Sequence, residues 1–188
     1  MKGCQDMNEA LVIIDYTNDF VATNGALTAG RPAQAIEDAI EQLAEQYARA
    51  GKFVFLPTDV HTPNDPFHPE TKLFPPHNVR DTWGRELYGQ LEPWYRSQAD
   101  NDKVIQFDKT RYSSFAGTPF DLLLRERKID HLHLVGVCTD ICVLHTAVDA
   151  YNLNYDLTIH QDAVATFKPG GQEWALDHFK TVLGASVV

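Results

Sequence analysis

The 188-residue chain is long enough for one domain with a substantial core, and its composition, 44% hydrophobic and 22% charged, is typical of a globular protein. A formal net charge of -10, without a basic cluster to offset it, disfavours binding to nucleic acid or to an anionic membrane. No signal peptide or membrane span is visible, and Cys4, Cys138 and Cys142 are too few for a secreted disulfide framework, so we expect a cytoplasmic protein with no membrane partner.

Six short apolar runs alternate with segments of helical periodicity along the chain. The runs predict β-strands at Ala10–Ile14, Phe53–Leu56, Val104–Phe107, Leu132–Val137, Tyr155–Ile159 and Ala185–Val188. Between them we expect helices over Ala33–Ala50, Pro119–Arg127, Ile141–Asn152 and Gln172–Leu183. Continuous apolar strands that alternate with helices are typical of a parallel sheet covered on both faces. The sequence therefore predicts a single three-layer αβα domain over residues 1–188, with a doubly wound α/β sheet.

One long irregular region interrupts this alternation, between Val60 and Trp83. It contains five prolines and three histidines. A loop of this length in a compact domain is usually either functional or disordered, and its aromatic and histidine content favours function. We therefore expect a metal-binding insertion at about residues 60–83.

Reactive side chains follow four of the predicted strands directly. They are Asp15 after the first strand, Asp59 and His61 after the second, Asp108 and Lys109 after the third, and Cys138, Asp140 and Cys142 after the fourth. Ligands of open parallel sheets bind beyond the carboxyl ends of the strands. The sequence thus places carboxylate, imidazole, ammonium and thiol groups around one crevice.

Asp15 and Lys109 each have an ordinary structural explanation as well as a catalytic one. Asp15 lies at the edge of a dry core, where burial would raise its pKa and suit it to proton transfer, but a strand-end aspartate can also cap a loop. Lys109 could hold the charge of Asp15 and stabilise a developing anion, whereas a lysine at a strand end is most often solvated. Sequence alone leaves both alternatives open.

Cys142 lies in the first turn of a predicted helix, where backbone N–H groups and the helix dipole stabilise a thiolate nucleophile. A lone cysteine is more often a small buried hydrophobe. Cys138 competes for the nucleophile role because it ends the preceding strand. A Cys138–Cys142 redox pair is a third interpretation, although its spacing is not that of a C-x-x-C motif.

Asp59 and His61 have the spacing at which alternate residues of an extended segment point to the same side. His68, Glu70 and His77 lie in the same irregular region and could complete a set of metal ligands. Mixed carboxylate and imidazole ligands suit zinc, with manganese and iron(II) as alternatives. The other interpretation is a histidine-rich surface loop that binds no metal.

Five segments resemble the nicotinamidase/pyrazinamidase branch of the isochorismatase-like cysteine hydrolases. They are LVIIDYTNDF, GALTAG, DVHTPNDPFHPETKLFPPHN, FDKTRYSSFAGT and GVCTDICVLHTAVDAYNLNYD, and together they span nearly the whole chain in the order of the family. The resemblance implies a six-stranded parallel sheet and a catalytic triad of Asp15, Lys109 and Cys142. It thereby assigns the nucleophile to the second cysteine of GVCTDICV.

The resemblance also implies one bound divalent metal ion. Asp59, His61 and His77 are the expected protein ligands. The fourth ligand differs between branches of the family, and the HPETKLFPPHN segment indicates Glu70 rather than His68.

A pocket for a flat heteroaromatic ring is implied in the same way. Phe20, Phe74 and Tyr112 match positions that wall this pocket, although each would also suit ordinary core packing. A cis peptide bond before Cys138 is expected to direct the backbone N–H groups of Cys138 and Cys142 into an oxyanion hole.

The function that the resemblance implies is hydrolysis of the small molecule nicotinamide to nicotinate and ammonia through a cysteine thioester, in NAD salvage. Deamidation of pyrazinamide-type analogues is expected too. The alternatives are an amidohydrolase of the same family with a different small amide, a hydrolase acting on the vinyl ether of isochorismate, and a catalytically silent binding module. The metal loop favours a nicotinamidase over an isochorismatase, and the intact triad argues against a silent module. The fold is compatible with a homo-oligomer.

Overall fold

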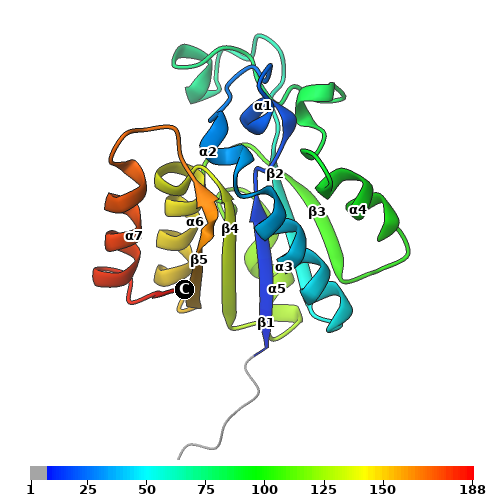
Figure 1. Cartoon of the computed structure of the whole chain (residues 1–188), viewed down its shortest axis with the longest axis vertical. Helices are drawn as coiled ribbons and strands as arrows, with labels where there is room; N and C mark the ends of the chain where they lie inside the picture. The colour runs from blue at the N-terminus through cyan, green and yellow to red at the C-terminus, as the bar shows by residue number, and fades with distance from the viewer. Residues whose placement is uncertain (1–7) are drawn as a thin grey trace, which may run out of the picture.

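The computed structural model describes residues 8–188, so Cys4 lies outside the described residues. The chain forms a six-stranded sheet with the strand order β3-β2-β1-β4-β5-β6, in which neighbouring strands are parallel (Figure 1). The strands are β1 (Glu9–Ile14), β2 (Phe53–Asp59), β3 (Val104–Lys109), β4 (His131–Val137), β5 (Asp156–Ala165) and β6 (Ser186–Val187). The predicted doubly wound parallel sheet is confirmed.

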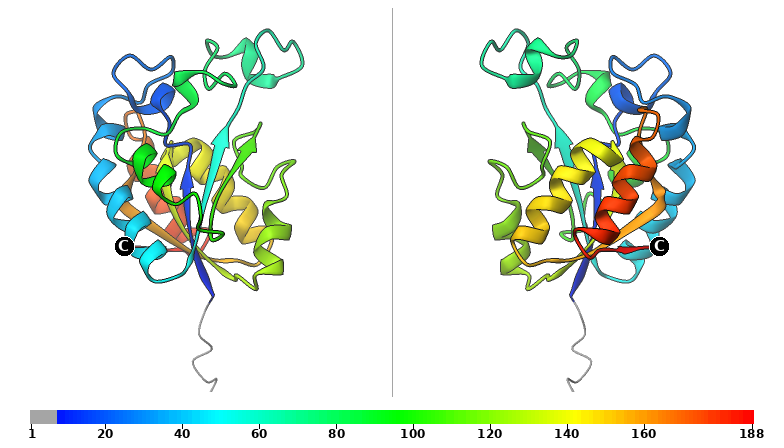
Figure 2. Two further views of the ribbon diagram at one scale, coloured as in Figure 1. Left: turned by 90° about the vertical axis from the view of Figure 1, so that its right-hand side faces the viewer. Right: turned by 90° about the vertical axis from the view of Figure 1, so that its left-hand side faces the viewer.

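Helices cover both faces of this sheet, with α3 and α6 on opposite sides (Figure 2). One layer consists of α2 (Arg31–Gln34), α3 (Glu37–Arg49) and α4 (Leu91–Ser97), and the other of α5 (Phe120–Glu126), α6 (Leu144–Asn152) and α7 (Gly171–Thr181). Alternate residues of a strand point to opposite faces, so Leu11 and Ile13 of β1 pack in the first layer and Val12 and Ile14 in the second. The three-layer αβα architecture is thus confirmed. Within residues 8–188, no helix combines the length and the apolarity that a membrane crossing requires.

The helix predicted over residues 33–50 is wrong at its start, because α2 and α3 are separate helices there. The buried hydroxyl of Tyr16 donates a hydrogen bond of 2.7 Å to the carbonyl of Ala33. In a continuous helix this carbonyl would accept a bond from the N–H group of Glu37, four residues later. A tertiary hydrogen bond therefore replaces the helical one and interrupts the helix.

Two further elements differ from the sequence prediction. β5 continues to Ala165, six residues beyond the predicted end at Ile159, and its pairing with β4 shifts register between Leu134 and Gly136. The helix α4 was not predicted, and it carries a proline, Pro93, in its first turn. Proline is tolerated in the first turn of a helix, where the backbone N–H group has no partner within the helix.

The strand order creates a crevice at the centre of the sheet. The strands β2 and β3 lie on one side of β1. The chain then crosses over to β4, which lies on the other side of β1. Ligands of open α/β sheets bind at such a reversal, outside the carboxyl ends of the strands. The segment 60–83, with the 3-10 turn η1 (Pro69–Lys72), lies above this end of the sheet, at the top of Figure 1.

Candidate active site

Asp15, Lys109 and Cys142 meet beyond the carboxyl ends of β1, β3 and β4. Nζ of Lys109 lies 2.7 Å from Oδ2 of Asp15 and 3.8 Å from Sγ of Cys142. The same ammonium donates a hydrogen bond of 3.0 Å to the carbonyl of Arg111. Lys109 is only 1% exposed, so it is a buried ion-pair partner rather than a solvated lysine. The structure thus brings the three predicted side chains into one buried cluster.

The backbone at Asp15 directs its carboxylate into this cluster. Asp15 has a left-handed backbone with φ of 55°, which aspartate tolerates better than most residues. Its N–H group donates to the carbonyl of Pro57 at 3.1 Å, and its Oδ1 accepts from the N–H group of Asp59 at 2.8 Å. With Oδ1 held by the β2 backbone, Oδ2 is left to face Lys109.

Burial determines the protonation states of this cluster. It raises the pKa of Asp15 to about 6, against the opposing effect of the Lys109 ammonium. Burial also raises the pKa of the Cys142 thiol well above its ordinary value, and Lys109 offsets only part of that effect. The helix N-terminus therefore does not keep the resting sulfur as a thiolate, and a base has to remove its proton. At neutral pH the sulfur keeps its proton, and Asp15 is an ionised carboxylate next to it.

Cys142 lies in η3 (Thr139–Val143), a π-helical turn between β4 and α6. Such turns occur frequently at functional sites. The peptide bond between Val137 and Cys138 is cis, as the family resemblance implies. Burial raises the pKa of the Cys138 thiol to about 12, so this second sulfur is a neutral group at physiological pH.

Four residues predicted as metal ligands form a buried group beside the triad. Nε2 of His61 lies 2.9 Å from Oδ2 of Asp59, and Nε2 of His77 lies 3.6 Å from both Oδ2 of Asp59 and Oε2 of Glu70. Nδ1 of His77 faces the carbonyl of Pro75 at 2.8 Å. A proton on Nδ1 would leave the lone pair of Nε2 directed at the two carboxylates. The irregular segment thus carries a compact ligand group rather than scattered surface histidines.

His68 lies in the same group, but both of its ring nitrogens have partners. Its Nε2 lies 2.8 Å from the carbonyl of Thr110, and its Nδ1 accepts a hydrogen bond of 3.3 Å from the N–H group of Glu70. One ligand atom each from His61, His68 and Glu70 also lie within 4.8 Å of one another. His68 is therefore close enough to be a ligand, but it would have to give up a hydrogen bond to become one.

The donor set fits a divalent cation. Nε2 of His77 is buried and has no hydrogen-bond partner among residues 8–188, which is costly unless a cation lies between it and the carboxylates of Asp59 and Glu70. Burial by itself would raise the pKa of Asp59, but Lys109 and His61 reverse this effect and hold the pKa at about 2. Ionised carboxylate and imidazole ligands are the donors that zinc and similar metals prefer.

A cavity lies between the Asp15–Lys109–Cys142 cluster and the metal-ligand group. All three predicted pocket aromatics, Phe20, Phe74 and Tyr112, line it. The other lining residues are Leu27, Asp59, Glu70, Cys138, Ile141, Cys142 and Phe167. The sequence prediction missed Leu27, Ile141 and Phe167. Phe167 reaches the cavity because β5 is longer than predicted, and the apolar AVATF run that follows His160 is the signal that could have found it.

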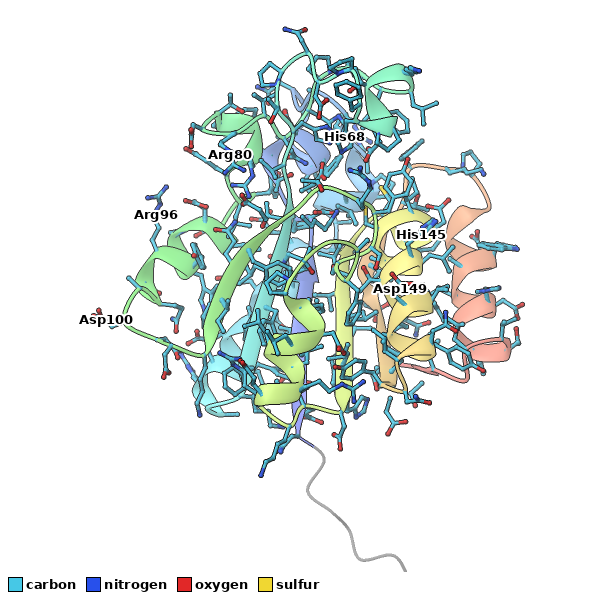
Figure 3. All side chains as sticks on the ribbon, turned by 180° about the vertical axis from the view of Figure 1, so that it is seen from behind. His68, Arg80, Arg96, Asp100, His145 and Asp149 are labelled. Carbon is cyan, nitrogen blue, oxygen red and sulfur yellow. The ribbon has the colours of Figure 1, made fainter. Side chains whose placement is uncertain are left out.

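Hydrogen bonds and ion pairs hold the metal-ligand segment in place. The N–H group of Asn78, next to His77, donates to Oδ2 of Asp19 at 2.7 Å. Asp108, which precedes Lys109, pairs with Arg85 and, at 2.8 Å, with Arg80. Figure 3 shows His68 and Arg80 on the same side of the molecule, above the sheet. The segment is thereby connected to the strand that carries the triad lysine.

Comparisons with known proteins agree with this site. A model of the isochorismatase domain family matches residues 9–187. An uncharacterized isochorismatase family protein of Bacillus subtilis, PncA, is 53% identical over 181 residues, which cover 96% of this chain and 99% of that protein. A crystal structure of nicotinamidase/pyrazinamidase PncA from Bacillus subtilis has a TM-score of 0.95 at 56% identity, over 97% of this chain and 100% of that chain.

One more distant relative among the solved structures contains a bound metal ion. The crystal structure of pyrazinamidase of Pyrococcus horikoshii in complex with zinc has a TM-score of 0.83 at 26% identity, and the match covers 96% of this chain and 98% of that one. The fold of the neighbours is thus shared over nearly the full length. Since the family model also spans almost every described residue, the chain belongs to the isochorismatase family.

Proposed function

We propose that the protein is a nicotinamidase that hydrolyses nicotinamide to nicotinate and ammonia. The observation that carries this proposal is the adjacency of three features: the Asp15–Lys109–Cys142 cluster, a mixed carboxylate and histidine ligand group, and an aromatic cavity between them. The names of the similar solved structures support the same substrate. We expect pyrazinamide and similar heteroaromatic amides to be deamidated as well.

In this proposal Cys142 is the nucleophile and Asp15 the base. The Asp15 carboxylate takes the proton of the thiol, and the sulfur attacks the carboxamide carbon. The ammonium of Lys109 keeps Asp15 ionised at neutral pH despite its burial, and it lies close enough to Cys142 to stabilise the thiolate as it forms. Proton transfer and attack are therefore coupled, because the buried thiol does not ionise beforehand.

The tetrahedral anion requires hydrogen-bond donors. We assign these to the backbone N–H groups of Cys138 and Cys142, each of which is worth roughly 3 kcal/mol in comparable sites. Asp15 then gives its proton to the departing nitrogen, the C–N bond breaks, and ammonia leaves a thioester. A water molecule that loses its proton to Asp15 attacks the thioester. The C–S bond breaks, the proton returns to the sulfur, and nicotinate is released.

We assign the metal ligands to Asp59, His61, Glu70 and His77, and zinc is the metal that this donor set suits best, with iron or manganese as alternatives. A cation held there would supply Lewis acidity and a fixed point of attachment for the ring nitrogen of the substrate or for water. Phe20, Phe74 and Tyr112 would hold the ring of the substrate in plane against the cavity wall. Nicotinate produced in this way would enter NAD salvage in the cytoplasm.

The experiment that tests this proposal is ammonia release from nicotinamide by the zinc-loaded protein, compared with release from aliphatic amides and from N-carbamoyl compounds. Fast turnover of nicotinamide alone, lost in Cys142→Ala and kept in Cys138→Ala, is the expected result. Faster turnover of an aliphatic amide would favour the alternative, an amidohydrolase of the same family with a different small amide. Loss of turnover in both cysteine variants would contradict the assignment of the nucleophile.

A further inference from the structure

A second group of titratable side chains lies at the amino ends of the central strands, whereas the cavity lies beyond their carboxyl ends. Glu9 is the first residue of β1 and pairs with His131, the first residue of β4. His133 follows two residues later and points to the same face of the sheet. One ligand atom from each of these three side chains lies within 4.8 Å of the other two. The amino ends of β1 and β4 are at the bottom of Figure 1, and the 60–83 segment is at the top.

Side chains of β5 orient both imidazoles. Nε2 of His131 lies 2.8 Å from Oγ1 of Thr158, and Nδ1 of His133 lies 2.9 Å from Nε2 of His160. When these two nitrogens carry the ring protons, Nδ1 of His131 and Nε2 of His133 present lone pairs. Hydrogen bonds to the second ring nitrogen are the usual way in which proteins orient histidine ligands of a metal.

The ring nitrogens that present lone pairs are the same two that lack hydrogen-bond partners among the described residues. Both Nδ1 of His131 and Nε2 of His133 are buried, and neither forms a hydrogen bond within residues 8–188. A buried acceptor without a partner costs free energy, so packing alone does not explain this arrangement. Nε2 of His133 instead lies 3.4 Å from Oε2 of Glu9, too poorly aligned for a hydrogen bond but within reach of a shared cation.

Glu9 is also oriented by a neighbour. Its Oε1 pairs with the ammonium of Lys52, which leaves Oε2 directed at the two histidines. The side chains of Glu9 and His133 keep 22% and 13% of their surface accessible to solvent, so an ion can reach the group. The three donors thus lie within 4.8 Å of one another, and two of their side chains are partly exposed to solvent.

We propose that Glu9, His131 and His133 form a second metal site, separate from the cavity, that binds a divalent cation of the zinc class. Two imidazoles and one carboxylate are a ligand set typical of zinc, which leaves a fourth position for water. The site fastens the amino end of β1 to that of β4, and through Thr158 and His160 it also involves β5. Its role is to stabilise the folded chain, because metal that binds only the folded state shifts the unfolding equilibrium.

The test is zinc stoichiometry after dialysis of metal-stripped protein against a zinc buffer, measured by elemental analysis. Four proteins are compared: wild type, His131→Gln/His133→Gln, His61→Gln/His77→Gln, and His178→Gln as a control histidine outside both groups. We expect wild type and the control to bind one more zinc ion per chain than either double variant. His131→Gln/His133→Gln should keep the deamidation activity of wild type, because its substitutions lie toward the amino end of β4, away from the cavity.

Equal zinc content in wild type and in His131→Gln/His133→Gln would overturn the proposal. If that variant does not fold, His61→Gln/His77→Gln still decides the question, because zinc held by the second site is lost when Glu9 is also replaced, whereas zinc held by Asp59, His68 and Glu70 is not. In that background Glu9→Gln should weaken zinc binding about 10-fold or more, and zinc should raise the Tm only while Glu9 is present. A His61→Gln/His77→Gln protein that binds no zinc would also overturn the proposal.

Discussion

The ammonium of Lys109 lies between two buried carboxylates, 2.7 Å from Oδ2 of Asp15 and 3.8 Å from Oδ1 of Asp59. The pairing of β2 with β3 produces this contact, because Asp59 and Lys109 are register partners at the ends of their strands. One cation therefore compensates a proposed catalytic carboxylate and a proposed metal ligand together. The sheet itself connects the two halves of the site.

Removing this cation should destabilise the protein as well as inactivate it. Lys109→Met preserves most of the side-chain volume but leaves the two carboxylates buried without their partner. Breaking a buried pair in this way costs about 3 kcal/mol or more of unfolding free energy. Urea denaturation and ammonia release measure the two effects. Lys180→Met, at an exposed position of α7, is the control and should change neither, and full stability of Lys109→Met would contradict the ion-pair interpretation.

The pH profile should show loss of activity in acid. Asp15 has to be ionised to accept the thiol proton, and burial raises its pKa to about 6. As the pH falls through this value the base becomes protonated, so kcat/KM should fall tenfold per pH unit below it. A cation on Asp59 would lower the pKa of Asp15, which places the acid limb at about pH 6 or below in the zinc-loaded enzyme. An acid limb near pH 8 would exclude Asp15 as the base.

Glu70 and His68 should differ in their effect on metal affinity. Glu70→Gln removes a charged donor that faces His77, so we expect zinc affinity to fall about 100-fold or more. His68→Gln should cost less than about 10-fold, because the ring of His68 is engaged by Thr110 and by the backbone of Glu70. Competition with a zinc-binding dye measures both values. The reverse order would make His68 the fourth ligand.

Phe167 should contribute to substrate binding rather than to chemistry. It lines the cavity although its side chain is about half exposed, at 53%. Phe167→Ala is expected to raise KM for nicotinamide about 10-fold with little change in kcat, because it removes a ring from the cavity wall but no group that donates, accepts or transfers a proton. Trp174→Ala, on α7 and similarly exposed, is the matched control. An unchanged KM in Phe167→Ala would remove this residue from the binding site.

The sequence predicts the sheet and most of the crevice, because both depend on local patterns. Apolar runs mark the strands, and the residues that follow them must lie at one edge of a parallel sheet. Asp15, Lys109 and Cys142 were found on that basis, and the family resemblance added the choice between Cys138 and Cys142. What local patterns cannot show is tertiary hydrogen bonding. The Tyr16–Ala33 bond that interrupts the predicted helix joins residues 17 positions apart.

Electrostatic states are equally hard to predict from sequence. A cysteine in the first turn of a helix suggests a thiolate, but the pKa of Cys142 depends on the burial that the whole fold creates. The histidines of β4 and β5 were also overlooked. In the sequence they are polar residues of a strand, which need no special explanation. Only the strand order, which pairs β1 with β4, shows that Glu9 lies beside them.

The ion pairs of Asp108 with Arg80 and Arg85 have a consequence for engineering. A designer who wishes to change the metal or the substrate of this scaffold would exchange residues 60–85 for the equivalent stretch of a relative. The exchanged stretch would lose its attachment unless the strand residue at position 108 came with it. The transplantable unit is therefore discontinuous: residues 60–85 together with Asp108.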